Sequence, residues 1–266
     1  MAHSFSQSTQ YPRRVANLTS RLQTAATMTM NSPDSLLELY KLANSSQHAQ
    51  SGNVHHGVYT AELMREVGLK NIGLNGVPRT INCLGAFYGG LPSNIQQELR
   101  KRPARRSLTP QNIETVVKRG DYVWNSVYHP FSDKLVDKLA ISHPDLPIFI
   151  KQGEYGALFS DPKEPELDPA VRPNVGRVLM SILAVATLRT QTGVGPQVLS
   201  HVFGLRKAYE DGSAAAEPEV EGGKWLGSDE GSVWLIEHID RIVAALGDGA
   251  GSGFAPGMTK EPKAKL

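Results

Sequence analysis

The chain of 266 residues contains a single cysteine, Cys83. One cysteine can form neither an internal disulfide nor a cysteine-based zinc cluster, and such sparse use is typical of intracellular proteins. An excess of one charge is also lacking, because 28 Lys and Arg nearly balance 26 Asp and Glu. The formal net charge of +2 is too small to predict nucleic acid as a partner.

Long apolar runs are missing as well. The most apolar stretch, VLMSILAVATL at residues 178–188, is shorter than the roughly 18 residues of a membrane-spanning helix, so we expect a core helix and no membrane partner. No segment shows the sustained alternation typical of strands. Apolar residues instead recur at helical spacing, as in SPDSLLELYKLANSSQ and SVWLIEHIDRIVAALG. The sequence therefore predicts an all-α fold.

Composition divides the chain into a helical domain at residues 1–246 and a Gly- and Pro-rich flexible tail at 247–266. A recurring order of helix types predicts two pseudo-repeated halves, 1–120 and 121–246, packed as one unit. The acidic, glycine-broken segment 210–231 is interpreted as an insertion. The basic stretch RKRPARR at 100–106 has no interleaved aromatic residues, which favours a solvated loop over a nucleic-acid patch.

Two segments carry features of targeting signals. Ala264, Lys265 and Leu266 end the chain and resemble the Ser-Lys-Leu peroxisomal address, which predicts a peroxisomal location and the import receptor as a partner. Residues 1–33 contain three arginines, many Ser and Thr and no acidic residue, which is transit-peptide composition and leaves the mitochondrion as an alternative. We favour the interpretation that this amino-terminal segment is the first helix of the fold.

The stretch GRVLMSILAVATLRTQTGVGPQVLSHVFGLRKAYEDG resembles the core of the AhpD-like and carboxymuconolactone decarboxylase-like superfamily, with a long apolar helix, a glycine-containing turn and a helix carrying a histidine. The resemblance implies the AhpD-like helical fold and homo-oligomers. In the thiol-peroxidase branch the motif is Glu-x11-Cys-x2-Cys-x3-His. With the histidine at His201, Gln197 and Val194 occupy the cysteine positions and Ile182 the glutamate position. Disulfide-cycling chemistry is therefore excluded at this site.

In the decarboxylase branch an acid precedes the histidine by four residues, and here Gln197 keeps that spacing without the charge. His201, Gln197 and Gly204 share one helix face. His201 is the candidate general acid or base, with a buried core histidine as the alternative. Arg79, near a helix start, is the candidate group that binds an anionic substrate, with a structural salt bridge as the alternative. For an enzyme we expect His201, Gln197 and Arg79 to converge on one cavity.

Three functions remain open at this stage. The first is a cofactor-free enzyme that transfers protons on a small carbonyl, lactone or acid substrate through His201. The second is a non-catalytic protein that keeps the fold for oligomerisation. The third is a one-cysteine peroxide reductase that uses Cys83, although apolar neighbours favour a buried, inert thiol. No pattern calls for a metal, a flavin or a nucleotide, and His55 and His56 are interpreted as part of a surface cluster.

Overall fold

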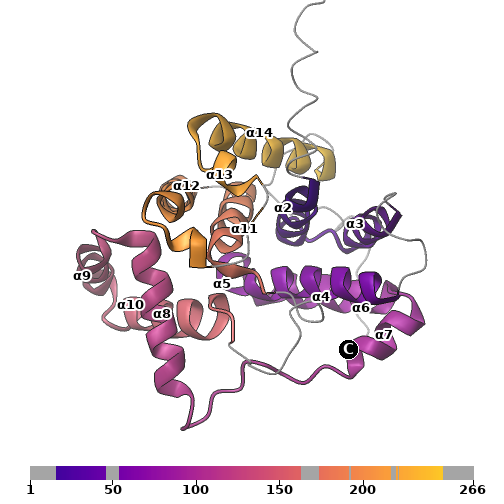
Figure 1. Ribbon diagram of the computed structural model, residues 1–266, viewed down its shortest axis with the longest axis horizontal. Helices are drawn as coiled ribbons and strands as arrows, with labels where there is room; N and C mark the ends of the chain where they lie inside the picture. Colours follow the sequence, from indigo (N-terminus) through magenta and orange to yellow (C-terminus); the bar gives the residue numbers. More distant parts are fainter. Residues whose placement is uncertain are drawn as a thin grey trace, which may run out of the picture.

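The computed structural model describes residues 16–45, 54–162, 174–191, 193–216, 220 and 222–247. Every regular element in these ranges is a helix, which confirms the predicted all-α class (Figure 1). The elements up to residue 100 are α2 (Ala16–Thr29), α3 (Pro33–Ser45), α4 (Val54–Lys70), α5 (Ile72–Asn75), α6 (Val77–Gly90) and α7 (Ser93–Arg100).

The elements after residue 100 build the rest of the molecule. They are α8 (Ile113–Tyr128), α9 (Ser132–Ser142), α10 (Asp145–Phe149), the π-helix η1 (Ile150–Phe159), α11 (Gly176–Thr190), α12 (Gly195–Glu210), the 3₁₀-helix η2 (Ser213–Ala216), α13 (Gly223–Leu226) and α14 (Asp229–Leu246). The sequence pattern predicted helix over η1, but not its wider π geometry.

Helix α11 lies at the centre of the fold (Figure 1). It packs against α2, α5, α12 and α14, and 13 of its 15 residues are buried. A helix that is apolar on all sides gains free energy when every face is removed from water, which explains this position. The stretch 178–188 is thus the core helix that its composition predicts.

A second, smaller apolar cluster lies between α3, α4, α6 and α7. Helix α2 contributes to both clusters, since Leu22 belongs to the larger one and Met28 to the smaller. The expected boundary between residues 120 and 121 falls inside α8. The two expected halves therefore do not separate at that position, and their pseudo-repeat stays a prediction.

The described part of the amino-terminal segment is a helix of the fold, because Leu22 and Met28 of α2 are fully buried. The transit-peptide alternative for residues 1–33 stays a prediction. Residues 1–15 lie outside the described residues, as do Ala264, Lys265 and Leu266. Among the helices of the described ranges, none combines the length and the apolar character that crossing a bilayer requires.

Two charged segments make contacts with the rest of the fold. Within 210–231, Leu226 is fully buried, and Ser228 caps α14 by accepting a hydrogen bond from the Gly231 amide (3.1 Å). The interpretation of this segment as an insertion stays a prediction. Within 100–106, Arg106 binds both carboxylate oxygens of Glu66 on α4, with Nη1 3.1 Å from Oε2. Arg106 is therefore held against α4, whereas Arg100, Lys101, Pro103 and Ala104 are exposed, so most of the stretch is solvated as predicted.

The backbones of α8 and η1 approach each other closely at two glycines. At Gly120 of α8, an added Cβ would lie 2.4 Å from the carbonyl oxygen of Lys151 and 2.8 Å from the amide nitrogen of Gly156. Gly156 of η1 is equally restricted, because its Cβ would lie 2.9 Å from the carbonyl oxygen of Val116. Glycine at these two positions therefore lets the helices touch through their main chains.

We expect Gly120→Ala to lower the free energy of unfolding by about 2 kcal/mol or more, because the new methyl group has to displace main-chain atoms. Gly85→Ala is the matched control, since Gly85 also lies inside a helix but its Cβ would meet nothing within 4 Å. The control is expected to stabilise the protein by about 0.5–1 kcal/mol, because alanine favours helix. Urea unfolding measures both, and equal effects would contradict this account of the α8–η1 contact.

Candidate functional site

His201 lies on the packed side of α12, with 5% of its surface exposed. Its ring meets the Tyr128 ring of α8 edge to face, at 6.2 Å between centroids. Gly204 and Ala208 on the same face are also buried, and an added Cβ at Gly204 would come within 2.9 Å of Val127. The shared face predicted from the sequence is therefore the face that packs against α8.

The environment of His201 disfavours the imidazolium form. Burial, with a smaller contribution from the charge of the nearby Arg177 guanidinium, lowers the pKa of His201 to about 4. Among the described residues, Nδ1 is buried and has no hydrogen-bond partner. At neutral pH the imidazole is therefore uncharged and enclosed by other side chains.

Arg177 is the residue that organises this region, and the sequence analysis missed it. From the first turn of α11 it donates hydrogen bonds to Ser126 Oγ (2.6 Å), Ser181 Oγ (2.5 Å) and the Gly204 carbonyl oxygen (2.8 Å). These contacts connect α11 to α8 and α12. In the sequence, Arg177 stands at the start of an apolar helix with a serine four residues later. This pattern is only a weak indication of a buried arginine, because an exposed arginine at a helix start gives the same pattern.

The other predicted residues do not join His201 in one cavity. Gln197 is exposed in the first turn of α12, although it shares the helix face of His201. Arg79 lies on α6, beside the smaller apolar cluster, whereas α12 packs on α8 and α11 (Figure 1). The expected convergence of His201, Gln197 and Arg79 is therefore wrong, because helical spacing fixes only which residues share a face of one helix.

Cys83 is fully buried on α6. Its thiol lies 3.8 Å from both the Met28 carbonyl oxygen and Asn31 Oδ1, to which it can donate weak hydrogen bonds. Burial raises the pKa of Cys83 to about 12, and the charge of Arg79 offsets only part of this effect. A thiol that stays protonated and enclosed is a poor nucleophile.

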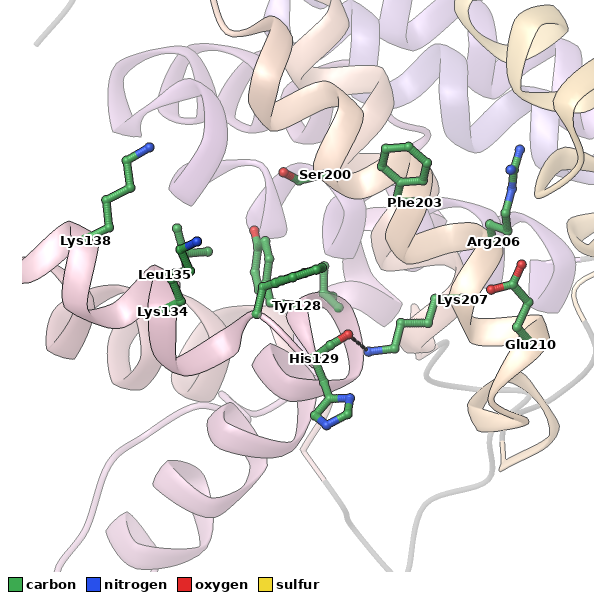
Figure 2. Close-up of a pocket in the computed structure, with 12 residues that line it drawn as sticks. Tyr128, His129, Lys134, Leu135, Lys138, Ser200, Phe203, Arg206, Lys207 and Glu210 are labelled. Carbon is green, nitrogen blue, oxygen red and sulfur yellow. Dashed lines mark hydrogen bonds between the residues drawn. The ribbon is translucent and has the colours of Figure 1, made fainter.

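The structure instead shows a groove between α8, α9 and α12, with a volume of about 670 Å³ (Figure 2). Figure 2 shows Phe203 on α12 facing Leu135 on α9, with Tyr128 between them. The apolar lining residues are Val127, Tyr128, Phe131, Leu135 and Phe203. Phe131 and Phe203 are 68% and 55% exposed, so solvent reaches much of this apolar surface.

Charged side chains surround the groove. Lys134 and Lys138 lie one turn apart on α9, while Lys207 and Arg206 lie on α12. The Lys207 ammonium donates to the carbonyl oxygen of His129 (2.5 Å) at the carboxyl end of α8. Burial lowers the pKa of Lys207, and Asp211 counteracts part of this shift.

Tyr128 connects the groove with the core. Its hydroxyl shares a hydrogen bond of 2.9 Å with the hydroxyl of Tyr155 on η1, and its ring lies 4.3 Å from that of Trp124 between centroids. Burial raises the pKa of Tyr128, although the hydrogen bond with Tyr155 and the charge of Arg177 act in the other direction. Tyr128 thus lines the groove as a neutral phenol, and its hydroxyl is held by the hydrogen bond with Tyr155.

These features define an all-α protein with an open, apolar groove of ligand size between helices. Comparison with family models, with curated proteins and with solved structures finds no match for this chain. The AhpD-like resemblance therefore remains an inference from the sequence motif. Within the described residues, no three His, Cys, Asp or Glu side chains come together in a group that could hold a metal ion.

The lowered pKa of His201 predicts a pH dependence of stability. The unfolded chain binds this proton near pH 6.5 and the folded chain only near pH 4, so the unfolded state binds more protons between these values. The stability contributed by the neutral imidazole is complete above pH 6.5 and is lost as the pH falls towards 4, by about 3 kcal/mol in total. Chemical denaturation at several pH values measures this decline in the free energy of unfolding.

His201→Leu removes this titration, so its unfolding free energy should decline less than that of the wild type over the same range. His55→Gln, on the exposed part of α4, serves as the control for loss of a histidine. Parallel curves for wild type and His201→Leu would show that the folded protein does not hold His201 neutral.

Proposed function

We propose that this protein binds a small organic molecule with an apolar body in the groove between α8, α9 and α12. The observation that carries this proposal is the groove of about 670 Å³ with its aromatic wall. Ligand sites commonly occupy about 300–1,000 Å³ and combine an apolar lining with a few polar groups. Exposed phenylalanine side chains also lose unfavourable contact with water when a ligand covers them.

We propose further that the chain is a divergent AhpD-like protein without the family's dithiol. The helix pair α11 and α12, joined by a short glycine-containing turn, supports this relationship, and His201 lies on the second helix. The family positions for acid and cysteines are held here by Ile182, Val194 and Gln197. A function without redox cycling agrees with these replacements.

Proton transfer by His201 is a second candidate function. One observation favours it: the neutral imidazole has no partner for Nδ1 among the described residues, and its ring contacts that of Tyr128, which lines the groove. Binding has stronger support, since His201 itself is 5% exposed and does not line the groove. The one-cysteine peroxidase has the least support, because the Cys83 thiol is buried and its pKa is raised.

Oligomerisation is the third candidate, and the exposed side chains of Leu199, Phe203 and Phe131 favour it. Large exposed apolar groups near one another are common where a second protein surface packs. A ligand and a second copy of the chain would compete for Phe203, so the same variant can test both. Homo-oligomers remain the expectation from the family resemblance.

A neutral, solvent-sensitive dye such as Nile red can test binding in the groove. We expect the wild type to bind the dye and Phe203→Asp to bind it about tenfold more weakly, because a charge replaces an apolar contact worth about 1.5–3 kcal/mol. Val233→Asp is the matched control, since Val233 is 56% exposed on α14 and outside the groove. Equal losses in both variants would reject the groove as the site, and a dimer that only Phe203→Asp dissociates would favour oligomerisation.

The proposed location is the peroxisome. A fluorescent protein fused to the amino terminus should collect in peroxisomes, because the import receptor reads a free carboxyl-terminal tripeptide. Deletion of Ala264, Lys265 and Leu266 should release the fusion to the cytosol. Mitochondrial fluorescence that survives the deletion would instead identify the Arg-, Ser- and Thr-rich amino terminus as the signal.

A further inference from the structure

The charged residues that line the groove are mostly cationic. Four of them carry positive charge and one, Glu210, carries negative charge, which gives the lining a formal excess of three positive charges (4 − 1 = 3). The excess is local, because the whole chain has a net charge of only +2. A positive rim around an apolar floor attracts anions to that face.

Of the cationic residues that line the groove, the two lysines of α9 are the best placed to bind an anionic ligand. Lys134 and Lys138 are exposed, and among the described residues no carboxylate lies within ion-pair distance of either. Their spacing of four residues places both ammonium groups along the same wall of the groove. Arg206 differs, because Asp229 binds its guanidinium and the Gly227 carbonyl oxygen accepts its Nε (3.2 Å).

Lys207 brings positive charge from the opposite wall. Its ammonium is held by the carbonyl oxygens of His129 (2.5 Å) and Asn125 (3.4 Å), which stabilise the charge without cancelling it. Phe203, one turn earlier on α12, and Leu135 on α9 form the apolar surface between the cationic walls (Figure 2). Apolar area and positive charge therefore lie within one groove.

We infer that the groove binds an amphipathic organic anion, with a long apolar body on Phe203, Leu135 and Tyr128 and a terminal anionic group at Lys134 and Lys138. The inference rests on the proposed function and adds the charge of the ligand. The lysine ammonium group is a compact point charge that binds a carboxylate or a phosphate without requiring bidentate geometry. The shared chemistry is thus a single anionic head on an apolar chain.

The experiment titrates the full chain with decanoate, decyl phosphate and 1-decanol, each below its aggregation concentration, with calorimetric detection. We expect both anions to bind about tenfold more tightly than the neutral alcohol at low salt, and the difference to shrink at high salt. The stronger of the two anions identifies the head group. Equal affinity of decanol and both anions overturns the inference but leaves the proposed function standing, whereas no binding of any of the three overturns both.

A double variant, Lys134→Gln with Lys138→Gln, locates the anionic head. It should reduce the ratio of anion affinity to decanol affinity from about tenfold to about one. Lys41→Gln with Lys118→Gln is the control with the same change in net charge, since both lysines are exposed and pair with Glu38 and Glu114 outside the groove. An equal loss in the control, or a dimer that excludes decanoate from the groove, overturns the inference.

Discussion

The fully buried ammonium group of Lys70 connects α4 with the end of η1 and, through Asp161, with the start of α11. Lys70, the last residue of α4, has no exposed surface, and its Nζ lies 2.9 Å from Asp161 and donates to the Phe159 carbonyl oxygen at the end of η1. Asp161 also accepts the Gly176 amide (2.7 Å) at the start of α11. Burial lowers the pKa of Lys70; burial alone would raise that of Asp161, but the lysine holds it below its usual value. Removing one member of such a pair costs about 3–5 kcal/mol, because the other charge stays buried without its partner.

This ion pair lies next to the contacts that Arg177 makes from the first turn of α11. Arg177 comes directly after Gly176, so the start of α11 places its guanidinium where Ser126 of α8 and the Gly204 carbonyl oxygen of α12 accept its hydrogen bonds. The absence of a side chain at Gly204 lets α8 and α12 approach. The groove lies between these helices and α9. Arg177 therefore connects two helices that line the groove to the start of α11, where Asp161 of the salt bridge binds.

The same arrangement separates binding from proton transfer. Burial and Arg177 keep His201 uncharged, and its ring contacts that of Tyr128, which lines the groove. His201 itself does not line the groove, and Tyr155 holds the phenol of Tyr128 by a hydrogen bond. The groove itself is open and positively charged. The geometry therefore supports a binding function more directly than a catalytic one.

Local pattern determined the all-α class, the core helix α11 and the helix face that His201 shares with Gly204. These features follow from residue spacing and helix-end chemistry, which act over a few neighbouring positions. Only the tertiary structure decided that Arg177 is buried and that Lys134 and Lys207 face one groove. Their positions depend on contacts between residues far apart in the chain, and a single sequence records the periodicity of each helix but not its partner helices.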